Sequence, residues 1–400
     1  MRANEQGRID DLLGVRHSRM AESPFGFLRG GAWIMAADLA TLPTTGYVLQ
    51  ICGDAHVRNL GAVAASDGTA VFDVNDFDET CRAPWEWELS RLAISLVVAA
   101  RAIGVSDALC RSATMTLIRT YRKTMRALVE LPAFALADYY VRRSPNQGEV
   151  GRVIARAQRM THVDFVTKYT TTKGTGARPH LREIPGKLRP CHGDEAATVL
   201  ASLTSYRDSL GPARQQTFEC YLPYDVAFKI AGTGSIGCRN YVVLCAGNGP
   251  DDPLLLQVKE ALPCAYLAQN LVPREPLSTH EGVRVANGGR RMQTWSDPFL
   301  GWTTLDGAPC YVRALADHEA SMDPTGLHPR ALEEYAEVCG EVFAKAHART
   351  GDPAIIAGYA GTSDKLDRAF ATRAFLGATQ TERDWEILAR AVSRGELIAA

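Results

Sequence analysis

Residues 52–59 read C-G-D-A-H-V-R-N and carry more information about the fold than any other stretch of this 400-residue chain. They follow an apolar run, Tyr47 to Cys52, that predicts a β-strand. Residues 72–79 read F-D-V-N-D-F-D-E, and a second apolar run, Ala70 to Val74, predicts another strand there. A turn signal, Asp67-Gly68, lies between the two stretches. A short hairpin would therefore bring both polar stretches to one place.

These two stretches contain carboxylate and amide groups at a spacing that suits chemistry on phosphate. Asp54, four residues and then Asn59 is the spacing of a kinase catalytic loop. In such a loop the aspartate accepts the proton of the attacking hydroxyl, and the asparagine oxygen binds magnesium. Asp76 would supply a second oxygen ligand, which Mg²⁺ prefers, with Asp73 and Asp78 as rivals. The alternative is a solvated turn whose polar side chains cap local backbone groups.

Residues 232–237 read G-T-G-S-I-G, a glycine-rich loop that could cradle phosphates. Its candidate nucleotide-binding residues are Gly232, Gly234, Ser235 and Gly237. A Rossmann fold also uses this pattern, but there a helix follows the glycines. Here the β-branched run at 240–245 predicts a strand, which is the kinase arrangement. Lys259 ends the next apolar run and is the candidate phosphate-binding lysine.

The pattern along the chain predicts an α+β fold of the protein-kinase-like, two-lobed type. Three strands are predicted at Asp225–Ala231, Arg239–Ala246 and Leu254–Lys259. Helices are predicted at 87–101, which is apolar nearly all round and ends near Gly104, at 107–142, and from Pro329 to Gly351. The stretch 143–195 predicts no regular element. We expect a helical part at 1–215 with the catalytic loop and metal motif, a β-rich nucleotide lobe at 216–316, and a helical return at 317–400.

The bulk composition is that of an ordinary globular protein. Hydrophobic residues make up 46% and charged residues 22%, and the net charge is −1, so no global field would attract nucleic acid or membrane. The longest apolar run, Leu92 to Ala100, is far too short to span a bilayer, and residues 1–13 lack a signal-peptide pattern. We therefore expect a cytoplasmic protein without a membrane or nucleic-acid partner. Its ten cysteines form no C-x-x-C pair, which predicts buried thiols rather than zinc ligands or disulfides.

The polar stretches resemble those of aminoglycoside phosphotransferases and choline kinases. The catalytic loop of those enzymes reads H-G-D-x-H-x-x-N, and Cys52 stands in place of the first histidine. The resemblance implies ATP and Mg²⁺, Asp54 as the base, Asn59 and Asp76 as metal ligands, and Glu88 as a brace of the loop. Residues 342–347, V-F-A-K-A-H, resemble the L-A-x-L-H helix that precedes this loop in those enzymes. The resemblance thus implies a circularly permuted fold, since the catalytic half comes first here.

The whole chain also resembles a bacterial family of unknown function. The shared motifs are S-P-F-G-F-L-R-G at 23–30, P-W-E-W-E-L at 84–89 and S-D-P-F-L-G-W at 296–302, and the resemblance runs from about residue 16 to 395. Where that family often has V-E-G-Q-R, this chain has Asn287 in place of the glutamate. That glutamate is one candidate partner of the lysine, and Glu275 and Glu281 are two others.

Several further residues are candidates with two interpretations. Arg29 either contacts phosphate or acceptor or closes an internal salt bridge. His56 either positions the base or the acceptor, or is a structural histidine, and His347 is expected to pack under the catalytic loop. A basic stretch could receive an anionic acceptor or form a solvated surface. It consists of Lys168, Lys173, Arg178, Arg182, Lys187 and Arg189.

The function expected from these patterns is ATP- and Mg²⁺-dependent phosphoryl transfer to the hydroxyl or amine of a small molecule. Two other classes compete with it. A nucleotide-binding pseudokinase would keep the site without turnover. An aspartyl-phosphate phosphatase would use residues 76–80, D-F-D-E-T, with Asp76 as nucleophile and Asp78 as acid and base. Transfer of AMP instead of phosphate is a fourth possibility.

Overall fold

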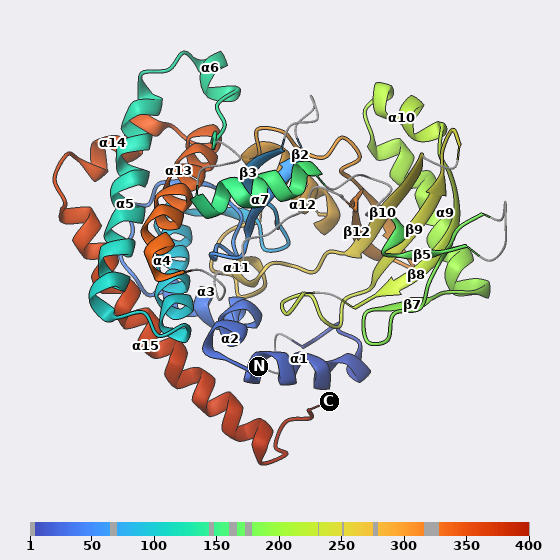
Figure 1. Cartoon of the computed structure of the whole chain (residues 1–400), viewed down its shortest axis with the longest axis horizontal. Coiled ribbons are helices and arrows are strands. Elements are labelled where there is room, and N and C mark those ends of the chain that lie inside the picture. Colours follow the sequence, from blue (N-terminus) through green and yellow to red (C-terminus); the bar gives the residue numbers. More distant parts are fainter. Residues whose placement is uncertain are drawn as a thin grey trace.

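The computed structural model describes residues 5–64, 70–143, 148–159, 166–172, 178–230, 232–249, 252–274, 279–315 and 328–399. It is a mixed α+β structure with a helical part and a β-rich part side by side (Figure 1). The chain begins and ends near the same edge of the molecule in this view. There the ring nitrogen Nδ1 of His17 lies 2.8 Å from the carbonyl oxygen of Ile398.

The helical part is built around α4 (Trp85–Ala102). All sixteen residues from Trp85 to Ala100 are buried, because neighbouring helices cover this helix on nearly every side. This confirms the predicted buried helix, which ends just before Gly104 in the left-handed region, at φ +75°. The helices that accompany it are α5 (Asp107–Val129), α6 (Ala133–Ala137), α13 (Leu332–Thr350), α14 (Pro353–Ala360) and α15 (Lys365–Ser393).

Two small antiparallel pairs hold the polar stretches at the centre of the molecule. Strand β1 (Val48–Ile51) pairs with β4 (Cys81–Pro84), and β2 (Leu60–Ala64) pairs with β3 (Ala70–Val74). The predicted strands at 47–52 and 70–74 are confirmed. The hairpin β2–β3 thus separates residues 52–59 from residues 75–80 along the chain and returns them to the same place.

The β-rich part is a six-stranded antiparallel sheet in the order β11-β12-β10-β9-β8-β7. The three strands predicted there are confirmed as β8, β9 and β10. Strand β7 also belongs to the sheet, and helix α9 (Gly193–Ser209) packs on it. Both elements lie before residue 216, where the predicted β-rich lobe begins. The strands are β7 (Leu188–Pro190), β8 (Leu222–Lys229), β9 (Asn240–Ala246), β10 (Pro253–Glu260), β11 (Gly301–Leu305) and β12 (Ala308–Ala314).

Short helices complete the molecule. The 3-10 helix η2 (Asp10–Leu12) and helices α1 (Leu13–Ala21), α2 (Pro24–Gly30) and α3 (Ala32–Ala40) lie below the centre in Figure 1. Helix α2 begins where Ser23 Oγ accepts a hydrogen bond from the Gly26 N–H at 3.0 Å and proline follows. The others are α10 (Pro212–Glu219), α11 (Ala265–Ala268), α12 (Glu281–Met292) and η4 (Pro329–Ala331).

One prediction about secondary structure is wrong. The sequence predicts an irregular stretch at 143–195, but it contains helix α7 (Gly148–Arg159) and three short strands, β5 (Thr170–Thr171), β6 (His180–Leu181) and β7. Helix α7 buries Val150, Val153, Ile154 and Ala157, an apolar face at helical spacing. The glycines, prolines and basic residues around this short face conceal its period in the sequence.

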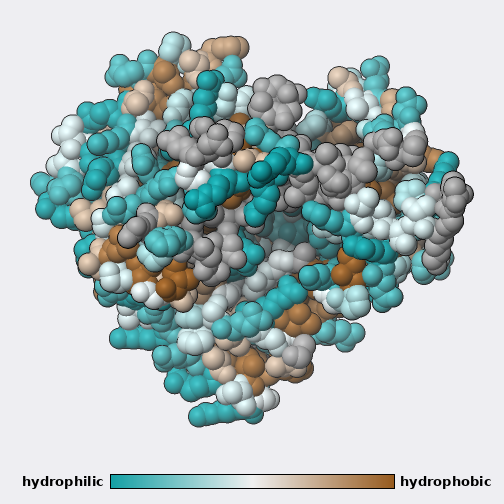
Figure 2. Space-filling model, in the orientation of Figure 1, coloured by the Kyte–Doolittle hydropathy of each residue, from teal (hydrophilic) through white to brown (hydrophobic). Residues whose placement is uncertain are grey.

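The cysteines and the described helices agree with the predictions of buried thiols and of no membrane span. All ten cysteines lie in the described ranges and are free, nine of them buried and Cys220 exposed. Among the described helices, none is long and apolar enough to cross a membrane. Hydrophilic residues dominate the face shown in Figure 2, and apolar residues form small separate patches on it.

Candidate functional site

The two polar stretches and the glycine-rich loop come together between the helical part and the sheet. Two adjoining cavities lie there. The lysine-side cavity is lined by Asn59, Asp76, Ser235 and Lys259, among others. The arginine-side cavity is lined by Asp54, Asp78, Gly234, Arg16 and Arg29, among others. Both cavities are bordered by Arg29, His56, Asp76, Gly232 and Ser235.

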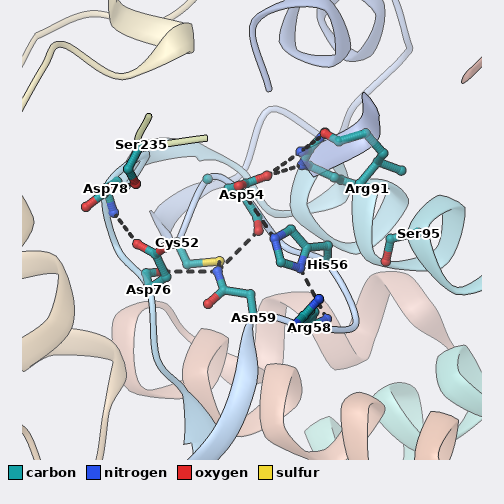
Figure 3. A network of polar contacts seen from close by, with 12 residues as sticks. Cys52, Asp54, His56, Arg58, Asn59, Asp76, Asp78, Arg91, Ser95 and Ser235 are labelled. Carbon is teal, nitrogen blue, oxygen red and sulfur yellow. Dashed lines mark hydrogen bonds and ion pairs between the residues drawn. The ribbon is translucent and has the colours of Figure 1, made fainter. Parts of the chain in front are cut away.

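Arg91 holds one oxygen of Asp54, and His56 lies near the other (Figure 3). Its Oδ1 accepts hydrogen bonds from Nε of Arg91 at 2.8 Å and from Nη2 of the same arginine. Arg91 is 1% exposed and comes from α4. The carboxylate is 20% exposed and lines the arginine-side cavity, so Oδ2 can meet a ligand there. Arg91 thus fixes the orientation of the carboxylate that the sequence marks as the base.

His56 is an uncharged neighbour of Asp54. Burial lowers the pKa of His56 to about 3; the charge of Asp54 opposes this shift, and the charges of Arg29 and Arg91 add to it. Its Nδ1 accepts a hydrogen bond from the Arg58 N–H at 3.2 Å, which assigns the ring proton to Nε2. That nitrogen lies 3.7 Å from Asp54 Oδ2. His56 can therefore orient Asp54 or a ligand, but it cannot supply a proton as an imidazolium near neutral pH.

The low pKa of His56 makes the protein less stable in acid. Between pH 3 and 6.5 the unfolded chain binds a proton at this position that the folded chain does not, so stability falls as pH falls below 6.5. From pH 7 to pH 5 this group alone should remove about 2 kcal/mol. Urea unfolding at the two pH values should show a smaller loss for His56→Asn than for the wild type. Equal losses in the two proteins would contradict the neutral, buried histidine.

Asn59 lines the lysine-side cavity and has an unsatisfied amide oxygen. Its Nδ2 donates to the carbonyl oxygens of Asp54 at 3.2 Å and Asp76 at 3.1 Å, which fixes the amide plane. Its Oδ1 is buried and has no hydrogen-bond partner among the described residues. A buried oxygen without a donor is costly unless a ligand completes it. Asn59 is thus oriented as a cation ligand would be.

Asp76 and Asp78 differ in their partners. Asp78 accepts hydrogen bonds from Lys259 Nζ and from Ser235 Oγ, the latter at 3.1 Å. Burial alone would raise the pKa of Asp78, but the charge of Lys259 and the hydrogen bonds that Asp78 accepts together lower it. Burial and the negative charge of Asp78 raise the pKa of Asp76. Asp76 is therefore the carboxylate that a bound cation would stabilise most.

Asp73, the other rival for the metal, is excluded from that role. It is 1% exposed, and both of its carboxylate oxygens lie 2.6 Å from Nζ of Lys345 on α13. A second internal contact supports the catalytic loop. Glu88 accepts the Gly53 N–H at 3.0 Å, and its other oxygen lies 2.8 Å from Nε2 of His347. Glu88 thus takes the bracing position that the resemblance implied, and His347 packs beneath the loop.

Glycines are required where the backbone turns tightly at the site. Gly53, Gly232 and Gly237 have φ of +81°, +74° and +92°. A Cβ on Gly53 would lie 1.9 Å from the carbonyl oxygen of Glu79, so the loop at 52–59 touches the stretch 72–79 at this point. The amino-terminal segment covers the glycine-rich loop, since the Ile9 N–H donates to the Gly237 carbonyl at 2.8 Å.

The sequence left the acidic partner of Lys259 open, and the structure pairs this lysine with Asp78. Glu281 binds Arg274 and Arg284 instead, each at 2.5 Å. Glu275 lies outside the described residues. In the basic stretch Lys173 lies outside them as well, and Arg189 forms a surface ion pair with Glu195 at 2.8 Å. None of the described members of that stretch lines either cavity.

Three site residues were missed in the sequence: Arg16, Arg91 and Lys345. Each is a buried cation, 0–1% exposed, on a helix. For Arg91 and Lys345 a signal exists, because a charged residue inside an otherwise apolar helix needs a partner. Arg16 has no comparable signal, because α1 has mixed polarity.

The residues present fit a magnesium ion bound together with phosphate. Asn59 Oδ1 and the Asp76 carboxylate are hard oxygen donors on one cavity wall, and Mg²⁺ commonly takes one or two protein oxygens plus phosphate and water. Within the described ranges, no group of three or more His, Cys, Asp and Glu side chains could hold a metal ion. The Asn59–Asp76 pair suits a cation that arrives with its phosphate ligand.

Fold and site together define a mixed α+β protein with a polar cavity where two distant sequence motifs meet. The chain belongs to the family described as "uncharacterized protein conserved in bacteria" (DUF2252), whose model matches residues 8–391. This confirms the family resemblance inferred from the motifs. Comparisons with curated proteins and with solved structures give no match.

Proposed function

We propose that this protein transfers the γ-phosphoryl group of Mg²⁺–ATP to a hydroxyl or amine of a small acceptor. The observation that carries the proposal is the meeting of two motifs about 180 positions apart. The Asp54–Asn59 loop and the Asp76 motif share one pair of cavities with the glycine-rich loop and Lys259. This is the set of groups that positions ATP and its metal in kinases.

The sheet supports nucleotide binding at the lysine side. The glycine-rich loop joins β8 to β9, and Lys259 lies on β10, so the lysine is on the third strand as in kinases. The Asp78 carboxylate bridges Lys259 and Ser235. An anionic oxygen thus already lies between the groups that would contact phosphate. ATP would compete with Asp78 for Lys259.

Asp54 is suited to act as general base on the acceptor. Arg91 holds Oδ1, which leaves Oδ2 for the acceptor hydroxyl. As the acceptor oxygen bonds to the γ-phosphorus, the bond from that phosphorus to the ADP oxygen breaks and Asp54 takes the hydroxyl proton. Mg²⁺ bound by Asn59 and Asp76 would neutralise charge on the phosphates. Arg29, which borders both cavities, is placed to contact the oxygens of the transferring group.

The contacts of α13 support a circularly permuted kinase-like fold. At its carboxyl end, Thr350 Oγ1 donates to the Gln50 carbonyl in β1 at 3.1 Å, and the Asp352 N–H donates to Tyr47 Oη at 2.5 Å. A chain running from α13 directly into β1 would restore the order helix, catalytic loop, metal motif. The present amino and carboxyl ends would then be joined to each other, as a circular permutation requires.

The phosphatase alternative is disfavoured by Thr80. That side chain is 0% exposed and donates to the Ile51 carbonyl, and it lines neither cavity that Asp76 and Asp78 line. A phosphatase of the D-x-D-x-T type would leave the glycine-rich loop and Lys259 without a role. A pseudokinase would bind Mg²⁺–ATP without forming ADP, and transfer of AMP would release pyrophosphate instead. The products distinguish these cases.

Thermal unfolding with and without Mg²⁺–ATP tests the nucleotide site. Ligand that binds the folded state raises its stability, by about 2.7 kcal/mol at a hundred times Kd. The wild type and the control Lys123→Ala, an exposed position on α5, should both be stabilised. Lys259→Ala should lose most of the shift, because the ammonium that binds phosphate is gone.

Two results would contradict the proposal. One is the absence of a shift in the wild type at millimolar Mg²⁺–ATP. The other is an equal shift in Lys259→Ala, which would show that ATP binds away from the glycine-rich loop. With nucleotide bound, the mass of the product then shows whether phosphate or AMP is transferred.

A further inference from the structure

We propose that the acceptor carries an oxyanion, a carboxylate or a phosphate ester, which Arg16 and Arg29 bind in the arginine-side cavity. That the bound oxyanion belongs to a phosphoryl acceptor rests on the proposed function. Binding of an oxyanion by the two arginines does not depend on it. The cavity also contains Asp54, so a group held by the arginines would lie beside the proposed base.

Arg16 is a buried cation with unused donors. It is 0% exposed, lines the cavity, and uses Nη2 to donate to the Gly30 carbonyl at 2.7 Å. Its Nε and Nη1 are buried and have no hydrogen-bond partner among the described residues. Burial lowers the pKa of Arg16 to about 10, so it remains charged at neutral pH. A charged guanidinium with two unused donors is costly unless a ligand accepts them.

Arg29 supplies a second guanidinium to the same space. Its Nε is also buried without a partner in the described part of the chain. No ion pair joins Arg16 or Arg29 to a carboxylate within the described ranges. The planar guanidinium group favours carboxylate and phosphate oxygens, which can accept two parallel hydrogen bonds.

Four carboxylates of this cavity each have a partner on at least one oxygen. Asp54 is bound by Arg91 and Asp78 by Lys259, and Glu260 accepts the Arg239 N–H at 2.9 Å. Glu79 accepts the Ala265 N–H at 2.6 Å, and burial raises its pKa to about 7, so much of it is neutral. Asp76 faces the proposed metal. The unused donors of the cavity are thus cationic, and they select against a cationic acceptor such as choline.

Small probes of different charge test this inference on the full chain. The probes are glycerol 3-phosphate and glycerate as the two oxyanions, glycerol as the neutral match, and choline as the cation, at equal ionic strength. We expect at least one oxyanion to raise the unfolding temperature of the wild type, whereas glycerol and choline do not. In Arg16→Gln the apparent affinity for that oxyanion should fall about tenfold or more, because hydrogen bonds to a charged donor are lost.

Four further arms separate this site from the nucleotide site. Arg29→Gln should also weaken the oxyanion and provides the test if Arg16→Gln does not fold. The exposed control Arg214→Gln should behave as the wild type does. Lys259→Ala should keep the oxyanion shift while losing the Mg²⁺–ATP shift, and Arg16→Gln should do the reverse.

Three outcomes overturn the inference. They are no shift with either oxyanion in the wild type, an oxyanion shift that persists in both arginine variants, and stabilisation by choline. If the wild type binds an oxyanion through Arg16 but does not bind Mg²⁺–ATP, the oxyanion site stands and phosphoryl transfer fails.

Discussion

Asp54→Asn should slow phosphoryl transfer by about 10²- to 10⁴-fold, the usual contribution of a general base, and leave Mg²⁺–ATP affinity nearly unchanged. The amide keeps the shape of the side chain but cannot take the proton of the acceptor. It also weakens the contact with Arg91, which binds a charged oxygen in the wild type. Binding should survive because Asp54 lines the arginine-side cavity and not the lysine-side one.

The rate can be measured as ADP formation, with glycerate, glycerol 3-phosphate and water as acceptors, and affinity by calorimetry with Mg²⁺–ADP. Asp208→Asn is the matched control, because this aspartate on α9 is 63% exposed and far along the chain from the site. A variant at Asp54 that turns over at the wild-type rate would show that another group takes the proton. A variant that loses nucleotide affinity would show that Asp54 contributes to nucleotide binding.

The sequence contained enough information to identify the polar loop residues that line the two cavities, although not Arg16. Asp54, Asn59 and Asp76 could be predicted together because each follows a strand whose apolar run is legible, and one short hairpin joins them. The glycine-rich loop and Lys259 could be predicted for the same reason, since β8, β9 and β10 are consecutive. Local patterns therefore predict each half of the site.

The partners of those groups could not be predicted, because they come from distant segments. Arg91 reaches Asp54 from 37 positions away, and Lys345 reaches Asp73 from 272 positions away. Nothing local distinguishes Asp78 from Glu281 as the partner of Lys259. The choice depends on where α12 packs, and Arg274 and Arg284 bind Glu281 there. Ion pairs across a fold are set by tertiary packing rather than by spacing.

Asp73→Asn should lower the free energy of unfolding by about 3–5 kcal/mol, since it leaves the Lys345 ammonium buried without its counter-ion. The pair is buried on both sides, with 1% and 2% of the two side chains exposed. Lys345 Nζ also donates to the Met292 carbonyl at 3.1 Å, so it cannot move into water without breaking the packing of α13. Burial lowers the pKa of Lys345, which shows how strongly this environment opposes its charge.

Urea unfolding of a double-mutant cycle measures the coupling of this pair. Lys345→Met alone should cost a similar amount, because it strands the Asp73 carboxylate. The double variant Asp73→Asn/Lys345→Met should cost much less than the sum of the two single changes, since no buried charge then remains. The surface pair Arg189–Glu195, 55% and 34% exposed, is the control, and Glu195→Gln should cost less than about 1 kcal/mol. Additive costs at Asp73 and Lys345 would mean that the two charges are not coupled. Strong coupling would show that this ion pair fastens β3 to α13, so that the hairpin carrying Asn59 and Asp76 is held by a helix from the other end of the chain.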